Sequence, residues 1–587
     1  MKVADAVFDF LSRKGVDQCF AVSGGAAAHL FDSISRYDIN IVHMHHEQAC
    51  SMAADGYARV ARKPALVLVT NGPGVSNAIT GVLGAFQDSI PMIVISGQVP
   101  RKQMLLNGGG VERQFGVQEV ETSPLVRSIV KNFISVTDAS ELSGALNNSW
   151  NAAISGRPGP VWIEIPLDVQ SEETAQIAEV LEGIPSFDFK FQDVKTFLRK
   201  ARKPLIVIGG GVHTSAAELE MIHFAQQTGI PVVSTWGAND ILNSENDLYI
   251  GNFGILGQRI ANYAVQKADL LLILGTRLSI PNTGYATELF SPGSVKIMIN
   301  IDEAEMTKSS LDIDLAIHAD LKLWLSKFEY PQLQNNSTFS EWRSNLKILE
   351  AEFGLSTEEF IEENYSIDSY RVVDELSESI PSNSTLVTDM GTSFTCTMQA
   401  FRNLRDARLF TSSGTSSMGF GLPGAIGAYF ADKSRPIYLI AGDGGFQMNI
   451  QEMQTVIFHK IPLRVIILNS NGYLAISIMQ NNSFSGNMVG STPESGVDAP
   501  DFSHIASAYG FETHRIENIG NLRTKLNEIK STQNPTLLEI RIPSSQVMRP
   551  RSQSLRRPDG SFYSQGLEVM WPYLTQNVLD KIEKSLS

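Results

Sequence analysis

Two glycine-containing segments carry oxygen-bearing side chains directly after short apolar runs. Gly442-Asp443-Gly444-Gly445-Phe446 follows the run at 436–440, and Asn469-Ser470-Asn471-Gly472-Tyr473 follows the run at 464–468. Glycine lets the backbone approach a phosphate, and the N-terminus of a following helix stabilises an anion. The Asp443 carboxylate is a hard oxygen ligand of the kind that Mg²⁺ prefers. Two neighbouring strands could hold one ion between such ends, although either segment alone is equally compatible with an ordinary strand-to-helix turn.

Similar apolar runs recur along the chain and predict the elements that position these segments. They lie at 65–69, 92–96, 205–208, 270–274, 437–440 and 465–468. They are rich in Val, Ile and Leu and do not alternate with polar residues, which is typical of parallel strands buried on both faces. Amphipathic stretches lie between them, so we predict an α/β chain with doubly wound parallel sheets. In such sheets ligands bind outside the carboxyl ends of the strands, where both glycine segments lie.

Composition and charge exclude several classes of protein. The 587 residues are 43% hydrophobic and 19% charged, with 47 Lys+Arg against 62 Asp+Glu and a net charge of −15. This is the composition of a globular chain of several domains, and it lacks the basic surface of a nucleic-acid binder. We find no apolar run of the roughly 18 residues that span a membrane and no signal-peptide apolar region. Three widely spaced cysteines are typical of free thiols in a reducing compartment. We expect a cytoplasmic protein without nucleic-acid or membrane partners.

Two changes in composition predict linkers, at 169–191 and at 330–367. They divide the chain into domains at 1–170, 190–328 and 368–550, followed by a C-terminal tail at 551–587.

The two glycine segments resemble the GDG…NN signature of thiamine diphosphate (ThDP) enzymes, and further matches extend the resemblance to their acetolactate synthase branch. The matches lie, in family order, at His46-Glu47-Gln48, 52–59, 72–77, 88–91, 156–161, 165–169, 418–423 and 446–452. The resemblance implies that the three domains are a pyrimidine-binding domain, a central Rossmann-like domain and a diphosphate-binding domain.

The resemblance also implies roles for individual residues. Glu47 would hydrogen-bond N1′ of the cofactor and so promote loss of its C2 proton, Met418 would hold the cofactor in a folded V, and Gln118 would lie near the reacting carbon. The segment 105–113 before Gln118 departs from the synthase pattern. Further cofactor contacts would come from Gly74, Asn77, Gly391, Thr392, Ser393, Gly444, Gly445 and Tyr473. The cluster His43, His45 and His46 would not bind a metal, because His46-Glu47-Gln48 already has this explanation.

The family binds Mg²⁺ through an Asp, an Asn and a backbone carbonyl, which here align with Asp443, Ser470 and Gly472. A serine hydroxyl can still coordinate Mg²⁺. Asn471 stays an alternative ligand that requires a one-residue shift.

Two further departures concern the acceptor substrate. Pro281 stands where synthases carry an arginine that holds the carboxylate of the second oxo acid, and Met479 stands at the position of their tryptophan. A bidentate arginine is a strong carboxylate partner, whereas proline offers no donor. We therefore expect an aldehyde or keto sugar as acceptor rather than a second pyruvate. The C-terminal region more softly resembles ThDP enzymes of bacterial surface-sugar pathways.

FAD, a structural cofactor of acetolactate synthases, is an open alternative. Gly209-Gly210-Gly211 and Gly275-Thr276-Arg277 match the synthase pattern, but Leu256 and Asn300 replace its His and Asp. A central domain without flavin is slightly favoured.

The resemblance as a whole implies a ThDP- and Mg²⁺-dependent carboligase, a transferase or lyase. It would decarboxylate a 2-oxo acid, expected to be pyruvate, and transfer the resulting enamine to an acceptor carbonyl. A true acetolactate synthase, a simple 2-oxo acid decarboxylase and a silent ThDP-binding paralogue stay open, and glycines 209–211 alone suggest an NAD dehydrogenase. Because the family site takes Glu47 from one subunit and the Asp443 segment from another, a homodimer or homotetramer is implied.

Overall fold

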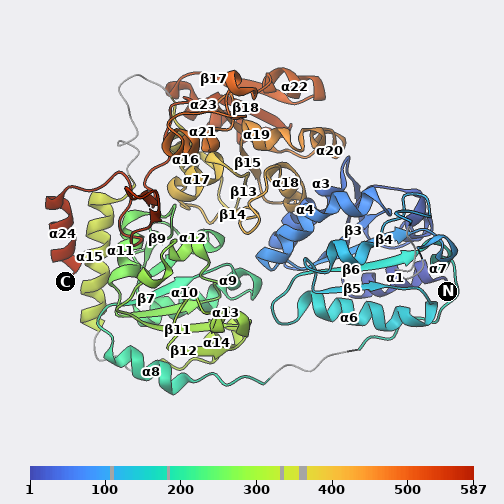
Figure 1. Cartoon of the computed structure of the whole chain (residues 1–587), viewed down its shortest axis with the longest axis horizontal. Helices are drawn as coiled ribbons and strands as arrows, with labels where there is room; N and C mark the ends of the chain where they lie inside the picture. The colour runs from blue at the N-terminus through green and yellow to red at the C-terminus, as the bar shows by residue number, and fades with distance from the viewer. Residues whose placement is uncertain (106–111, 181–185, 331–335, 356–366, 587) are drawn as a thin grey trace.

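Figure 1 shows the computed structural model of the chain, which describes residues 1–105, 112–180, 186–330, 336–355 and 367–586, without the side chains of 336–338. Parts of both predicted linkers, and residues 106–111 of the segment before Gln118, therefore lie outside the described residues. Apart from two short strands near the C-terminus, the described strands form three six-stranded parallel sheets with helices packed on their faces, which confirms the predicted α/β class. None of the described helices is long and apolar enough to cross a membrane.

The first sheet has the strand order β2-β1-β3-β4-β6-β5. Its strands are β1 (Gln18–Ala21), β2 (Asn40–His43), β3 (Ala65–Val69), β4 (Met92–Gln98), β5 (Asn132–Ser135) and β6 (Pro160–Pro166). The helices are α1 (Val3–Arg13), α2 (Ala28–Ile34), α3 (Glu47–Ala61), α4 (Pro73–Asp88), α5 (Thr122–Val126), α6 (Leu142–Ile154) and α7 (Leu167–Gln170). Phe20 of β1 packs into one hydrophobic core while its neighbours Cys19 and Ala21 pack into another. Both faces of the strand are thus buried, which explains the continuous apolar runs.

The third sheet repeats this order as β14-β13-β15-β16-β18-β17. Its strands are β13 (Thr385–Thr388), β14 (Arg408–Phe410), β15 (Ile437–Gly442), β16 (Arg464–Asn469), β17 (Glu512–Ile516) and β18 (Thr536–Arg541). The helices are α16 (Ser369–Ser379), α17 (Thr392–Ala400), α18 (Gly421–Ala431), α19 (Asp443–Gln447), α20 (Met453–Phe458), α21 (Leu474–Ser483), α22 (Phe502–Tyr509) and α23 (Ile519–Ile529), with a 3₁₀ turn η7 (Ile450–Glu452) before α20.

The central sheet differs, with the order β12-β11-β10-β7-β8-β9, which is the Rossmann order of dinucleotide-binding sheets. Its strands are β7 (Pro204–Ile208), β8 (Val232–Ser234), β9 (Tyr249–Asn252), β10 (Leu270–Leu274), β11 (Val295–Asn300) and β12 (Leu315–His318). The helices are α8 (Phe191–Lys200), α9 (Gly211–Thr214), α10 (Glu218–Thr228), α11 (Arg259–Lys267), α12 (Ile280–Thr283), α13 (Glu303–Thr307), α14 (Leu321–Lys327) and α15 (Asn336–Phe353). The second predicted linker contains α15, whose Trp342 and Leu346 are buried against this domain.

The C-terminal segment returns to the central domain. It contains the short strands β19 (Leu555–Arg556) and β20 (Phe562–Tyr563) and ends in α24 (Gln576–Leu586), which packs against α15. The Asn262 side chain of α11 donates to the carbonyl of Leu567 at 2.9 Å. The Arg259 guanidinium donates to the carbonyl of Met570 at 3.0 Å. The tail is therefore fixed to the domain on its far side from the first sheet (Figure 1).

Helices α3 and α18 join the first and third domains (Figure 1). A Cβ atom on Gly56 would collide with the carbonyl of Gly424, and one on Gly427 would collide with the carbonyl of Ala53. Only glycine allows the two backbones to approach so closely. Buried side chains of both domains form one continuous core around this helix pair, so the two domains are held together as one packed unit.

A cluster of charges joins all three domains at a second place. Both ring nitrogens of His213 lie 2.7 Å from carboxylate oxygens, Nδ1 from Glu218 and Nε2 from Asp240. Asp240, which is buried, also pairs with Arg408 of β14. Glu218 pairs with Arg62, at the end of α3, at 2.7 Å. Within this cluster, the central domain thus contributes two carboxylates, one for an arginine of each of the other two domains.

Candidate active site

The three residues predicted to bind Mg²⁺ lie together where β15 and β16 end. The two strands are parallel neighbours, with Gly442 opposite Leu468. The Oδ2 atom of Asp443 accepts hydrogen bonds from the N–H groups of Ser470 at 2.9 Å and Gly472 at 3.1 Å. The Ser470 hydroxyl lies 3.3 Å from the same oxygen and 3.1 Å from the Gly472 carbonyl oxygen. Burial raises the pKa of Asp443, and the surrounding backbone N–H groups partly offset that effect.

This group of oxygens fits a magnesium ion. A carboxylate, a hydroxyl and a carbonyl are hard ligands, and Mg–O distances of 2.0–2.1 Å at right angles place adjacent ligand oxygens about 3 Å apart. The separations of 3.3 and 3.1 Å at Ser470 are close to that value. The alternative ligand Asn471 instead accepts a hydrogen bond on its Oδ1 from the Ala499 N–H at 3.0 Å. Its side-chain oxygen is therefore already engaged elsewhere.

The start of α17 offers donors for an anion beside this group. Gly391 has φ +93°, and a Cβ atom placed on it would meet no atom within 4 Å. The Thr392 Oγ1 atom is buried and has no hydrogen-bond partner among the described residues. The Ser393 hydroxyl donates to the Asp389 carbonyl at 3.0 Å. A buried hydroxyl without a partner, at a helix N-terminus that faces open space, fits a bound diphosphate oxygen.

Met418 and Tyr473 meet over Gly444. A Cβ atom on Gly444 would collide with the Tyr473 ring and would lie 3.1 Å from the Met418 methyl group. Glycine is therefore required at this position, where the backbone after Asp443 passes beneath two side chains that the family resemblance assigns to the cofactor.

Asp389, a residue that the sequence reasoning missed, holds the turn that carries Met418. Its carboxylate accepts hydrogen bonds from the N–H groups of Met390 at 2.7 Å, Gly419 at 3.1 Å and Gly421 at 2.8 Å. Burial raises the pKa of Asp389 to about 6. The available signal was an acidic residue directly after an apolar strand and two residues before a glycine, the same pattern that identified Asp443.

On the first domain, Glu47 begins α3 and is buried. Its Oε2 atom accepts a hydrogen bond from Asn77 of α4 at 2.9 Å, so two predicted site residues meet. Gly74, also on α4, lies against Thr70. Gln118 has φ +57°, and its carbonyl lies so close to Gly72 that a Cβ atom there would collide with it. The side chain of Gln118 is exposed.

Other predicted residues are not brought together in one chain. Among the described residues, the only hydrogen-bond partner of the Glu47 carboxylate is Asn77. Pro281 lies in α12 of the central domain, where its carbonyl accepts the Ile255 N–H at 2.9 Å. Met479 is exposed on α21 of the third domain. The described contacts do not join these last two residues into one acceptor pocket.

The loops that would receive a flavin contact each other directly. The Gly211 N–H donates to the Gly275 carbonyl at 2.7 Å, and a Cβ atom on Gly209 would collide with Thr276. The Asn300 amide donates to the Thr276 carbonyl at 3.1 Å, while its Oδ1 accepts the Asp302 N–H at 3.1 Å. These polar groups are satisfied within the sheet edge, so the described contacts give no support for FAD.

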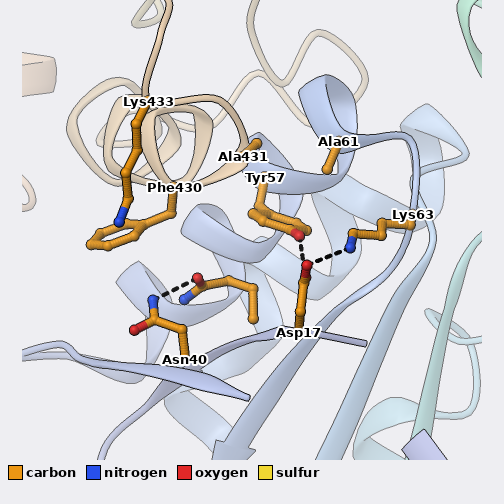
Figure 2. Close-up of a pocket in the computed structure, with 9 residues that line it drawn as sticks. Asp17, Asn40, Tyr57, Ala61, Lys63, Phe430, Ala431 and Lys433 are labelled. Atoms are coloured by element: carbon orange, nitrogen blue, oxygen red, sulfur yellow. Dashed lines mark hydrogen bonds and ion pairs between the residues drawn. The ribbon is translucent and has the colours of Figure 1, made fainter. Parts of the chain in front are cut away.

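Figure 2 shows a pocket of about 300 Å³ between the first and third domains. The Asp17 carboxylate in it accepts hydrogen bonds from the Tyr57 hydroxyl at 2.5 Å and from the Lys63 ammonium at 2.6 Å. The Lys433 ammonium lies 5.3 Å from the centre of the Phe430 ring. The pocket lies at the end of the first sheet where β1 and β2 begin, whereas Glu47 follows the opposite end of β2. The pocket is therefore separate from the candidate active site.

Three family profiles match successive parts of the chain. They describe the N-terminal TPP binding domain of thiamine pyrophosphate enzymes at residues 1–109, the central domain at 191–328 and the C-terminal TPP binding domain at 389–540. The acetolactate synthase isozyme 1 large subunit of Escherichia coli (strain K12) is 30% identical over 553 residues, which cover 93% of this chain and 95% of the relative.

Two further relatives have the same level of identity. The isozyme 2 large subunit of that organism is 30% identical over 97% of this chain and 100% of its own length. The chloroplastic acetolactate synthase of Arabidopsis thaliana is 30% identical over 94% of this chain and 82% of its own length. With all three domain profiles matched in order, the chain belongs to the thiamine pyrophosphate enzymes, as a ThDP-dependent carboligase of the acetolactate synthase-like branch that acts on 2-oxo acids.

Proposed function

We propose that this carboligase requires Mg²⁺, takes pyruvate as its donor and uses an aldehyde or a keto sugar, rather than a second pyruvate, as its acceptor. The observation that carries the cofactor part of the proposal is the group of oxygens from Asp443, Ser470 and Gly472. The observation behind the acceptor part is Pro281, at the position where the synthase pattern has an arginine.

When bound, ThDP would supply the nucleophilic carbon needed for decarboxylation of a 2-oxo acid and transfer of its acyl unit. Asp443, Ser470 and Gly472 would hold Mg²⁺ against the diphosphate. The Thr392 hydroxyl and the N–H groups at the start of α17 would donate to the diphosphate oxygens. Together, the metal ligands and the donors of α17 would hold the cofactor's diphosphate in a fixed position.

Glu47 is the residue that we propose for proton transfer. Its carboxyl group would donate a proton to N1′ of the aminopyrimidine, and Asn77 orients the group by donating to Oε2. Because Glu47 is buried, water competes little for the carboxylate. Met418 and Tyr473, which meet over Gly444, would exclude water from the other side of the cofactor.

The acceptor proposal follows from the absence of a cation at position 281. A carboxylate taken out of water without a charged partner costs several kcal/mol, and about 1.4 kcal/mol corresponds to a factor of ten. Two arginines, Arg277 and Arg551, are candidates to replace the missing one. Arg277 lies 3.7 Å from the Asp88 carboxylate, and Arg551 lies over the Trp571 ring at 5.1 Å. Arg277 is therefore already paired with a carboxylate, which supports a neutral acceptor.

Product analysis tests this proposal. Pyruvate is supplied alone or with an aldehyde or keto sugar, and products are identified by mass spectrometry and NMR. We expect acetolactate from pyruvate alone to form at least about 100-fold more slowly than the mixed product, given a penalty of several kcal/mol. Pro281→Arg should raise acetolactate formation, while Ile280→Val, at an exposed neighbour in α12, serves as the control. Acetolactate formed at an undiminished rate in the presence of every neutral acceptor would refute the acceptor proposal.

We also propose that the chain works as a homodimer or homotetramer with active sites between subunits. Two observations support this. The Glu47 carboxylate is not joined to the Asp443 segment by the described hydrogen bonds of one chain, and large apolar side chains are exposed at Phe115, Val117 and Met479. Light scattering with and without ThDP and Mg²⁺ gives the mass directly, and a monomer that turns over pyruvate would contradict the proposal.

A further inference from the structure

Residues on both sides of Glu47 are hydrogen-bonded to the third domain of the same chain. On one side, the His45 N–H donates to Oε1 of Glu452 at 3.0 Å. On the other, the Gln48 side-chain oxygen accepts a hydrogen bond from Asn449 at 3.2 Å. Glu452 and Asn449 lie three residues apart, at the end and the start of the segment around η7. Two contacts from one short segment thus bracket the residue that begins α3.

Glu452 is fully buried and both of its carboxylate oxygens are engaged. Oε1 accepts from His45, and Oε2 accepts from the Thr455 hydroxyl at 2.6 Å. Among the described residues, no lysine or arginine pairs with it. A buried carboxylate is costly unless it is hydrogen-bonded, so its partners account for its presence. Of these partners, His45 belongs to another domain, so the carboxylate links η7 to the residues just before α3.

Asn449 connects the same turn of α3 to the turn that carries Met418. Its buried amide nitrogen donates to the Gly419 carbonyl at 2.8 Å as well as to Gln48. The opposite side of the Met418 turn is fixed by Asp389, which accepts the Gly419 N–H. An amide group has two hydrogens, so Asn449 can make both bonds at once. It therefore sets the distance between the start of α3 and the turn after Met418.

We infer that Glu452 and Asn449 are positioning residues, which fix the N-terminal turn of α3 from the third domain of the same chain and thereby fix the position of the Glu47 carboxylate at the start of that helix. The inference rests on the proposed function, in which Glu47 acts on the cofactor. Both residues act through their neighbours and do not themselves touch the cofactor in this account. A catalytic group displaced by about 1 Å loses on the order of 100-fold in rate, so the loss of either contact is expected to be visible in proton transfer before it is visible in binding.

The test uses Glu452→Ala, Asn449→Ala and Glu452→Gln, which keeps an acceptor oxygen for the His45 N–H. Asp55→Asn is the matched control. Asp55 is also a buried carboxylate on α3, but it pairs with Arg59 further along the helix, away from Glu47. Without cofactor, amide hydrogen exchange of the peptide around residues 44–52 is followed by mass spectrometry. We expect at least about tenfold faster exchange in both alanine variants and no change in that peptide in Asp55→Asn, since exchange reports local opening.

With cofactor, the same proteins are loaded with ThDP and Mg²⁺, and exchange of the C2 proton for deuterium is measured by acid quench and NMR. We expect the alanine variants to slow this exchange by about 10- to 100-fold, with a ThDP dissociation constant within about threefold of wild type. Glu452→Gln should remain near wild type. A purely structural role predicts instead a lower melting temperature and weaker ThDP binding with an unchanged exchange rate per bound cofactor, and that result overturns the inference, as does equal slowing in Asp55→Asn.

Glu47→Gln separates this inference from the proposed function. If Glu47→Gln leaves C2 exchange at the wild-type rate, the proposed role of Glu47 fails. If Glu47→Gln stops exchange while Glu452→Ala and Asn449→Ala do not slow it, the positioning inference alone fails.

Discussion

Replacing Ser470 by alanine isolates one proposed magnesium ligand without dismantling the site. The Asp443 carboxylate would keep three backbone donors, the N–H groups of Gly444, Ser470 and Gly472 at 2.8, 2.9 and 3.1 Å. It therefore stays in place while the hydroxyl is lost. Without metal, the variant loses one weak hydrogen bond, worth about 1 kcal/mol of the free energy of unfolding.

With metal, the loss should be larger. Removing an outer-shell partner of a bound ion typically costs 10–100-fold in affinity, and a direct ligand should cost at least about tenfold. Because Mg²⁺ readily keeps water as a ligand, a water molecule in place of the hydroxyl should hold the loss within about 100-fold. This range equals about 1.4–2.8 kcal/mol of binding free energy.

The assay titrates Mg²⁺ into the protein at saturating ThDP and uses calorimetry to measure the half-saturating Mg²⁺ concentration. Asn471→Ala is the control. Since the Asn471 side-chain oxygen accepts from Ala499, its loss should change the half-saturating Mg²⁺ concentration by less than about threefold while lowering stability by about 1 kcal/mol. A shift smaller than twofold in Ser470→Ala, or a tenfold shift in Asn471→Ala, would show that the ligand was assigned to the wrong residue.

Three further predictions concern Glu47, Asp443 and the charge cluster around Asp240. Glu47→Gln should abolish pyruvate turnover while the circular dichroism spectrum and melting temperature stay near wild type, and turnover near the wild-type rate would remove Glu47 from the mechanism. Asp443→Ala should lose measurable ThDP binding in calorimetry, because the metal that offsets the diphosphate charge loses its carboxylate ligand; unchanged affinity would contradict this. Burial opposes ionisation of Asp240, but Arg408 and His213 outweigh it and hold the pKa of Asp240 below its usual range. Its contribution to stability is therefore present above pH 4 or so and lost as pH falls further, so the melting-temperature gap between wild type and Asp240→Asn should narrow below about pH 4.

The fold could be predicted because its signals are local. The apolar runs at 437–440 and 465–468 fall within β15 and β16, and the glycine segments after them begin the turns where Asp443 and Ser470 meet. Short apolar runs that do not alternate with polar residues were enough to indicate parallel strands. That β15 and β16 are neighbours could also be expected, because a short helical connection joins them. This neighbourhood brings Asp443 and Ser470 together.

The contacts that position the site could not be predicted because their partners are distant in sequence. Asp389 binds Gly419 and Gly421, which lie 30 and 32 residues away, and Glu452 binds His45 across 407 residues. No periodicity or spacing reports such pairs. The role of Asn471 was also hidden from the sequence, since it depends on a left-handed backbone, φ +61°, that turns its side chain toward Ala499.

The pairing of α3 with α18 has a consequence for the origin of the chain. Each helix connects the second and third strands of its domain in chain order, and the two sheets share one strand order. Ala53 and Gly427, which touch, each lie six positions after the first residue of their helix. Equivalent surfaces that meet in this way form an isologous contact, the kind that relates two copies in a symmetric dimer. Such a contact within one polypeptide is what gene duplication and fusion of a self-pairing domain would leave, with Glu47 in one descendant and Asp443, the proposed magnesium ligand, in the other.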